Sequence, residues 1–373
     1  MKRRGRFERQ HRLPRLHGYR LVLLIVCAVL AVLSGACWAA LAGLQGTLVT
    51  QSAADAWRGE SEERFAQVSV FLPVNGTKTL DEIRSFRATL EEKFVQESME
   101  APEGGSLYTD AFSGETELTA YGTASGNLTV TAIGVGGDYF LFHPLPLLSG
   151  SYLTADDYMG DRVVLDEQTA FALFGSSDVA GMELTINGKT YPVAGVVDRE
   201  SDFASQAALA SEDPNKPSGD SKAIIFMGYE ALNAISELPI DCYEIVLPDP
   251  VSGYGKKMVT ETFPVGTGVV VQNTDRLSVS GLVSVLGSFG KRVMTTRGVV
   301  YPYWENAARM IESYAAVLLL LAVLLGLMPA VCLVIVLVKL IRRGLVGAYT
   351  DAARRIESRV EANKQKHYVS GGI

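Results

Sequence analysis

Two uncharged apolar segments constrain this chain more than any other feature of its sequence: residues 21–44 and residues 315–338, each 24 residues long. An α-helix rises about 1.5 Å per residue, so each segment is about 36 Å long as a helix. That length exceeds the hydrocarbon core of a bilayer, which is about 30 Å thick. Because a chain inside lipid must satisfy its own backbone hydrogen bonds, we expect both segments to be membrane-spanning helices.

The flanking charges predict which side of the membrane each part of the chain occupies. Residues 1–20 carry eight basic residues and one acidic residue, and residues 339–373 carry eight and three. The residues between these ends hold a net charge of −19 within a total of −7. The positive-inside rule therefore predicts two cytoplasmic basic ends and an extracytoplasmic stalk and domain over residues 45–311. Basic ends around an acidic middle argue against a plain cytosolic enzyme and against a nucleic-acid-binding domain.

Two other interpretations of the first apolar segment remain open. It could be a cleaved signal peptide, and the sequence around Cys37 resembles a bacterial lipobox. Both are weaker than a membrane-spanning helix, because the apolar run is long for a signal core and continues beyond Cys37 to Leu41. Three of the four cysteines fall in the apolar segments, so Cys242 has no partner for a disulfide in the external domain.

Two long helices are expected to continue out of the membrane as a stalk. Residues 45–65 are polar but favour a helix, which predicts that the first helix extends into them. Pro302 suits the first turn of a helix that runs from residue 303 to residue 343. Before the second apolar segment, four aromatic residues are expected to form a belt at the membrane surface: Tyr301, Tyr303, Trp304 and Tyr314.

The middle of the chain predicts a mixed α/β or α+β domain. Residues 68–72 alternate as a strand, and Thr79 with Glu82 forms a capping box before a helix with an apolar face. Asn187-Gly188 is the strongest two-residue hairpin signal. Two or three strands are expected within residues 106–133, with breaks at Ser113-Gly114 and Ser125-Gly126. The remaining expected elements are a helix over residues 167–174 capped by Asp166, a loop over residues 198–221, a strand–helix–strand over residues 223–246 and a helix over residues 274–287.

No motif in the sequence predicts catalysis, a cofactor or a metal. His143 is the one histidine outside the predicted membrane and cytoplasmic parts, and we interpret it as a structural or surface residue. Asn187-Gly188-Lys189-Thr190 lacks the first glycine of a phosphate-binding loop, and no Cys/His spacing suits zinc. Acidic pairs such as Asp156-Asp157 are interpreted as solvated surface. The sequence therefore favours a protein that is not an enzyme.

Two features predict a mechanical role. Gly326 and Pro329 interrupt the second apolar segment and are candidates for a hinge, although an ordinary membrane proline is an equal alternative. The tail after residue 338 predicts an amphipathic helix that docks on a cytoplasmic partner or lies on anionic lipid. Its apolar stripe and neighbouring basic residues give the candidate docking residues: Leu345, Tyr349, Ile356, Val360, Arg354 and Arg355. Small residues over positions 35–43 make a homodimer through the membrane plausible.

A series of short motifs between residues 138 and 197 resembles a known family. The motifs are Asp138-Tyr-Phe-Leu, Pro146-Leu-Leu-Ser-Gly150, Leu153-Thr-Ala-Asp156-Asp157, Arg162-Val-Val-Leu-Asp-Glu-Gln-Thr-Ala170, Leu173-Phe-Gly175, Val179-Ala-Gly181 and Ile186-Asn-Gly-Lys-Thr-Tyr-Pro-Val-Ala-Gly-Val-Val197. Together they resemble the extracytoplasmic core domain of MacB-type ABC transporter permeases, which are relatives of FtsX. The resemblance covers about sixty residues, and the domain follows an N-terminal membrane helix as in that family.

The resemblance implies a permease subunit of the bacterial plasma membrane that works with a separate cytoplasmic ABC ATPase. Such subunits couple ATP hydrolysis to movement of an external domain, which implies a role in export of peptides or other compounds. Family permeases usually have four spans, whereas this chain ends 35 residues after Val338. We therefore expect a further permease subunit as a second partner. The alternative is a non-transporting membrane-bound sensor or scaffold that binds an extracellular peptide or a cell-wall component.

Overall fold

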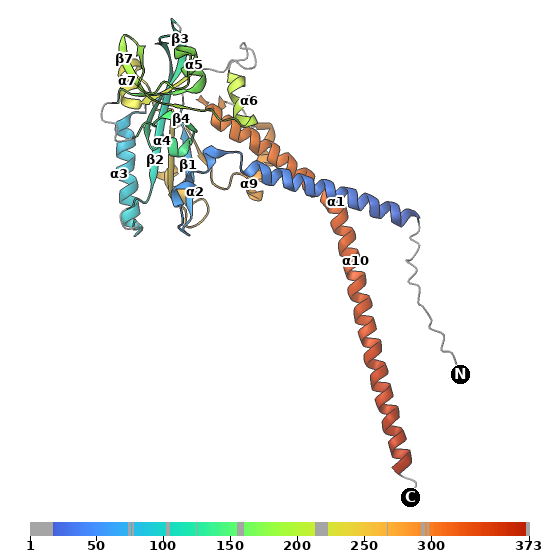
Figure 1. Cartoon of the computed structure of the whole chain (residues 1–373). Coiled ribbons are helices and arrows are strands. Elements are labelled where there is room, and N and C mark those ends of the chain that lie inside the picture. The colour runs from blue at the N-terminus through green and yellow to red at the C-terminus, as the bar shows by residue number, and fades with distance from the viewer. Residues whose placement is uncertain are drawn as a thin grey trace, which may run out of the picture. The chain divides into compact units, whose positions relative to one another are not determined.

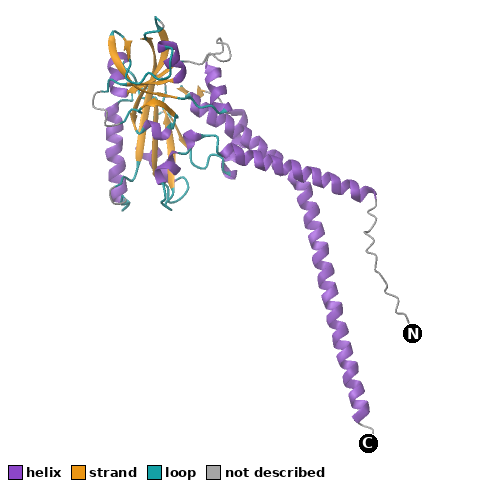
Figure 2. Cartoon of the chain, in the orientation of Figure 1, coloured by secondary structure: helices purple, strands orange, loops and turns teal. Residues whose placement is uncertain are grey.

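The computed structural model divides into two compact units, Gly43–Ala316 and the pair of segments Met1–Ala42 and Val317–Ile373. Figure 1 shows the chain by residue number and Figure 2 by secondary structure. The structure describes residues 18–73, 76, 78–101, 105–124, 126–154, 160–212, 223–266, 268–291, 295–296 and 298–370.

The unit Gly43–Ala316 contains a large mixed sheet with helices on both faces (Figure 2). Its strands are β1 Phe65–Phe71, β2 Thr109–Tyr121, β3 Leu128–Gly137, β4 Leu147–Gly150, β5 Val163–Asp166, β6 Glu183–Ile186, β7 Lys189–Val197, β8 Ile224–Gly228, β9 Cys242–Pro248 and β10 Val269–Gln272. They pair in the order β10-β1-β9-β2-β3-β8-β5-β7-β4, and β6 pairs with β2 and β7. The pairs β3/β8 and β5/β7 are parallel and the others are antiparallel. A separate hairpin joins β11 Thr295–Thr296 and β12 Val299–Val300.

The helices of the described residues follow in chain order. They are α1 Gly18–Gln45, η1 Val49–Gln51, α2 Ala53–Arg58, α3 Leu80–Gln96, α4 Tyr139–Phe142, α5 Glu167–Phe174, α6 Phe203–Glu212, α7 Tyr229–Ser236, α8 Tyr254–Thr262, α9 Val279–Ser288, η2 Phe289–Lys291 and α10 Tyr303–Ser370.

The sheet separates two apolar cores, because successive side chains of a strand point to opposite faces. On β1, Val70 belongs to a core that α3, α5, α7 and α8 complete. Its neighbour Phe71 belongs to a second core that α2, α4, α6 and the start of α10 complete. The second core therefore joins the domain to the helix that contains residues 315–338.

Several local predictions are confirmed. Asn187 and Gly188 have φ of 49° and 77°, as a two-residue hairpin turn requires. The Thr79 amide donates to a Glu82 carboxylate oxygen at 3.0 Å, which is one half of the capping box. Asp166 caps α5 by accepting from the Thr169 amide at 2.6 Å.

The first helix does not continue through residues 45–65, contrary to the sequence prediction. α1 ends at Gln45, and the Thr47 hydroxyl donates to the Leu44 carbonyl at 2.7 Å, which satisfies a carbonyl at the end of the helix. Ala53 and Ala54 of α2 are then buried against the sheet core. Burial of these small apolar residues favours a turn back onto the domain over an extended polar stalk helix.

Two predictions of where the chain forms loops are also wrong. Ser113-Gly114 lies within β2, and a Cβ at Gly114 would lie 2.3 Å from the Pro239 carbonyl oxygen. This glycine therefore allows close approach of two backbones. Residues 203–212 of the expected 198–221 loop form α6, where Asp202 accepts from the Ser205 amide at 2.9 Å.

The expected helix over residues 274–287 begins later, at Val279 of α9, because Ser278 caps it. Residues 213–222 and Asp156-Asp157 lie outside the described residues.

Most of the predicted aromatic belt is part of the protein core. Tyr301, Tyr303 and Trp304 are at most 7% exposed and belong to the second core. Tyr314 alone of the four is exposed, at 51%. Tyr314 lies eleven residues after Tyr303 in α10, about 16 Å farther along the helix axis.

The other unit contains the bulk of α1 and of α10, which contact each other within it. The Ser34 hydroxyl donates to the Ala322 carbonyl at 2.8 Å, and the sulfur atoms of Cys27 and Cys332 lie 3.5 Å apart. In the described part of the chain, Gly18–Leu44 and Tyr303–Val360 contain helices that are long and apolar enough to cross a membrane. The chain is thus a membrane protein with a mixed α/β domain between two apolar helices.

Candidate functional site

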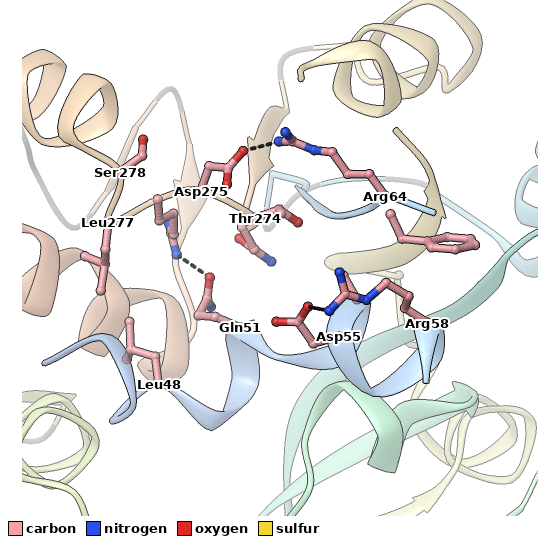
Figure 3. A pocket seen from close by; sticks show the side chains of 13 residues that line it. Leu48, Gln51, Asp55, Arg58, Arg64, Thr274, Asp275, Leu277 and Ser278 are labelled. Atoms are coloured by element: carbon pink, nitrogen blue, oxygen red, sulfur yellow. Dashed lines mark hydrogen bonds and ion pairs between the residues drawn. The ribbon is translucent and has the colours of Figure 1, made fainter. Parts of the chain in front are cut away.

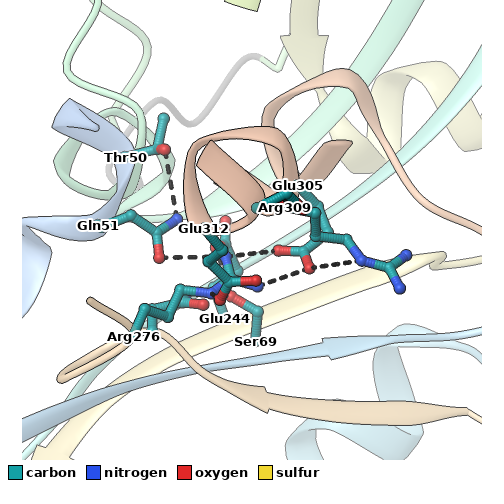
Figure 4. Close-up of polar contacts among 10 residues, drawn as sticks. Thr50, Gln51, Ser69, Glu244, Arg276, Glu305, Arg309 and Glu312 are labelled. Atoms are coloured by element: carbon teal, nitrogen blue, oxygen red, sulfur yellow. Dashed lines mark hydrogen bonds and ion pairs between the residues drawn. The ribbon is translucent and has the colours of Figure 1, made fainter. Parts of the chain in front are cut away.

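The candidate site is a buried group of charges where α10 joins the domain (Figure 4). Arg276 precedes α9, and its guanidinium donates two hydrogen bonds to Glu305, at 2.6 and 2.8 Å. Its Nε lies 2.8 Å from Glu312 Oε1. The two glutamates are seven residues apart on α10, which places them on one face two turns apart. We call Arg276, Glu305 and Glu312 the Arg276 cluster.

Burial defines the electrostatics of the Arg276 cluster. The three side chains are 3–10% exposed. Burial raises the pKa of Glu305, and the charge of Arg276 acts against that rise. For Arg276 itself, burial disfavours the charged form, but Glu305 and Glu312 outweigh that effect and raise its pKa above the ordinary value. The cluster therefore holds a permanent positive charge between two carboxylates in the interior.

A second series of polar side-chain contacts connects the sheet to the same helix. Glu244 of β9 lies 2.5 Å from His143 Nε2, and the Ser69 hydroxyl of β1 donates to Glu244 at 2.8 Å. The side-chain amide of Asn273 donates in turn to the Ser69 hydroxyl oxygen at 2.7 Å. The His143 ring lies 4.7 Å from the Trp304 ring of α10, centroid to centroid. His143 is only 1% exposed, so the structure places it in the core as a structural residue.

The first turn of α10 also contacts the segment after β7. The Tyr303 hydroxyl donates to Glu200 at 3.0 Å, and burial raises the pKa of Glu200. The adjacent Arg199 donates through Nε to Asp166 at 2.9 Å. Through these contacts, α10 is hydrogen-bonded to the segment after β7 and to the segment before α9, and its Trp304 ring packs against His143.

A pocket of about 480 Å³ lies beside the Arg276 cluster (Figure 3). It is lined by Leu48, Gln51, Ala54, Asp55, Arg58, Arg64, Phe65, Asn273, Thr274, Asp275, Arg276, Leu277 and Ser278. Its arginines are paired: Arg58 with Asp55 at 3.2 Å, and Arg64 with Asp275. The third arginine, Arg276, is paired with Glu305 outside the lining, so the lining itself carries three arginines and two aspartates. Such a polar lining suits a polar ligand, and no nucleophile beside a general base marks it as catalytic.

The residues predicted from sequence lie in the other unit. Leu345, Tyr349, Ile356 and Val360 are 49–78% exposed on α10, with Arg354 and Arg355 also exposed. Pro329 lies within α10, and the helix continues on both sides of it. At Gly326 a Cβ would lie 2.9 Å from the Ser34 hydroxyl, so this glycine permits close packing of α1 on α10.

Sequence reasoning missed the Arg276 cluster. A signal was present, because Glu305 and Glu312 are acidic residues at a heptad spacing just before an apolar segment. Their partner lies about thirty residues earlier and follows a strand, a relation that the sequence does not reveal. Within the described residues, no group of three or more His, Cys, Asp or Glu side chains is placed to hold a metal ion.

Comparison with known proteins assigns the family. The model of the MacB-like periplasmic core domain matches residues 41–230, which is more than half of the chain, so the chain belongs to this family. The family comprises permease-like components of ABC-type transporters, and its members work with cytoplasmic ABC ATPases. The search of functionally curated proteins found no match.

Two solved structures are similar to this chain at low identity. The periplasmic region of MacB from Actinobacillus actinomycetemcomitans is 16% identical, with a TM-score of 0.40 over 61% of this chain and 94% of that chain. The extracellular domain of the ABC-type transporter YknZ from Gram-positive bacteria is 13% identical, with a TM-score of 0.34 over 52% of this chain and 88% of that chain.

Proposed function

We propose that this chain is an accessory permease-like subunit that couples a cytoplasmic ABC ATPase to its extracytoplasmic domain by mechanical transmission. In this proposal both termini are cytoplasmic, residues 45–311 are extracytoplasmic, and residues 21–44 and 315–338 cross the plasma membrane. The movement serves export of peptides or other compounds. A further permease subunit completes the assembly, and a homodimer through the small residues of α1 is compatible with it.

The observation that carries the proposal is the continuity of α10. One helix runs from Tyr303 to Ser370, and its first turns are fixed in the domain core by the Arg276 cluster. The first turns of α10 also bury apolar residues such as Ala307, Ala308 and Ile311 in the second core, and exposing them to water costs free energy, so the junction resists local separation. A force applied to the distal part of α10 would therefore move the domain rather than pull the helix out of it.

The tail of α10 is the proposed docking surface for the ATPase. Leu345, Ile356 and Val360 expose apolar side chains that water solvates poorly, which suits a groove on a partner protein. Gly326 and Pro329 are the proposed hinge, because Pro329 cannot donate a hydrogen bond to the carbonyl of residue 325. Pro329→Ala is expected to weaken export while leaving recovery of the ATPase intact.

Affinity purification in mild detergent tests the proposal. The full chain should recover an ABC ATPase, and the variant Leu345→Asp/Ile356→Asp/Val360→Asp should lose it. The matched control is Val95→Asp on α3, which also puts a charge on an exposed valine but lies in the domain. Failure of the well-folded wild-type chain to recover any ATPase would contradict the proposal.

The pocket supports a second candidate function, a membrane-bound sensor or scaffold for an extracellular peptide or cell-wall component. A cavity of about 480 Å³ is large enough for a short peptide or a sugar. In this case a ligand would act through Arg276, which lines the pocket and also holds α10. Recovery of an ATPase that depends on Leu345, Ile356 and Val360 of the tail would favour the first candidate function over this one.

A further inference from the structure

Helix α9 differs from the other surface helices of the domain because it lacks charge. Residues 277–290 contain no Asp, Glu, Lys or Arg. By contrast, α3 carries charged residues along its length. Helices that face water keep charged or polar residues on their outer side, so an uncharged outer side needs a different explanation.

Both faces of α9 are apolar. Leu282 and Val285 are buried against the domain, as the helix period requires. On the outer side, Val279 and Val283 are 59% and 56% exposed, and Phe289 in the next turn is 50% exposed. The only polar groups among them are serine hydroxyls. An exposed helix side that carries two valines and no charge is typical of a contact with another apolar phase.

Within the domain, the start of α9 lies near residues that follow the first apolar segment and residues that precede the second. Leu277, directly before α9, packs on a core cluster that contains Leu48 and Ile311 and is also contacted by Leu44. Leu44 is the last residue of the first apolar segment, and Ile311 precedes the second by four residues. The exposed rings of Phe203 and Tyr314 lie 6.0 Å apart, centroid to centroid.

Lipid is the occupant that fits this location and composition. An uncharged apolar helix suits the boundary between the headgroups and the acyl chains. Exposed aromatic side chains such as Tyr314 and Phe203 prefer the same depth of the bilayer. The helix carries no charge that would need water at its outer face.

We propose that the outer face of α9, formed by Val279, Val283 and Phe289, lies in the headgroup region of the membrane leaflet that the domain faces. The contact gives the domain a third point of membrane attachment besides its two spanning helices. It rests on the assignment of residues 21–44 and 315–338 as membrane spans, and it does not depend on an ATPase.

Spin labelling of the full chain in nanodiscs tests this contact. A nitroxide is attached in the variant Val283→Cys, and Val95→Cys on α3 is the control because Val95 is 77% exposed. The nanodiscs contain phosphatidylethanolamine and phosphatidylglycerol, and the unmodified chain, with its native cysteines in apolar helices or the core, gives the labelling background. Collision with oxygen, which concentrates in lipid, is compared with collision with a water-soluble nickel complex.

The expected result is a ratio of oxygen to nickel collisions that is several-fold higher at position 283 than at position 95. A label at Val279→Cys repeats the measurement one turn earlier, in case one variant folds poorly. Equal ratios at positions 283 and 95 would show that α9 faces water and would overturn the proposal. Reduced collision with both reagents would also overturn it, because it would show a contact with protein. Recovery of an ATPase by the same variants tests the proposed function separately.

Discussion

Replacing Arg276 by methionine tests whether the Arg276 cluster fixes α10 to the domain. The substitution keeps much of the side-chain volume but removes the charge that Glu305 and Glu312 share. Two buried carboxylates then lie without their cation, and they must either stay charged in the interior or take up protons. Both outcomes cost free energy, because burial already raises the pKa of Glu305.

The expected loss is about 3–5 kcal/mol of the free energy of unfolding, the usual cost of removing one partner of a buried pair. A typical domain is stable by about 5–15 kcal/mol, so this is a large fraction. The control is Arg58→Met, since Arg58 and Asp55 are 40% and 77% exposed and such pairs contribute about 0–1 kcal/mol. The triple variant Arg276→Met/Glu305→Leu/Glu312→Leu should regain most of the loss, because no unpaired charge remains.

Urea unfolding of the full chain in mild detergent, followed by tryptophan fluorescence, measures these differences. Trp304 reports on the junction directly, because its ring contacts His143 in the core. A loss for Arg276→Met no larger than that for Arg58→Met would refute the reasoning, since it would mean that the buried charges are solvated in solution. A triple variant as unstable as the single one would refute the electrostatic explanation and point to packing instead.

Two further predictions concern the helix pair and the pH dependence of stability. The sulfur atoms of Cys27 and Cys332 lie 3.5 Å apart, so mild oxidation should form an intrachain disulfide between α1 and α10. Peptide mass spectrometry detects this crosslink, which should be absent in Cys332→Ser. No crosslink in the oxidised wild type would mean that the two helices do not pack as described. Burial raises the pKa of Glu200 in the folded chain above that of an unfolded glutamate. The contribution of protonated Glu200 to the free energy of unfolding is therefore complete below the unfolded pKa, and it is lost as the pH rises through the folded pKa. Urea unfolding across that pH window should show a flatter profile for Glu200→Gln than for wild type, and identical slopes would exclude Glu200 as the cause.

Local sequence signals predicted the elements whose determinants are local. The Asn187-Gly188 turn, the Asp166 cap and the Thr79–Glu82 capping box each depend on residues within four positions of one another. The MacB-like motifs between residues 138 and 197 placed the chain in its family, which the family model confirms over residues 41–230.

Tertiary contacts decided the remainder of the fold and the candidate site. Residues 45–65 favour a helix in isolation, but burial of Ala53 and Ala54 against the sheet turns the chain back. The aromatic residues before the second apolar segment suit a membrane surface equally well as a protein core, and only the packing of α10 distinguishes the two. The Arg276 cluster joins side chains about thirty residues apart in sequence, so no local pattern identified it.

In the proposed mechanism, α10 carries movement from a cytoplasmic ATPase to the extracytoplasmic domain. Amide hydrogen exchange of the purified subunit–ATPase complex in nanodiscs, with and without trapped ATP, measures it at residues 299–316, where α10 enters the domain. Mechanical transmission through α10 predicts that ATP changes exchange there in wild type and that the change disappears in Leu345→Asp/Ile356→Asp/Val360→Asp. Unchanged exchange at these residues while the wild-type complex hydrolyses ATP would contradict it.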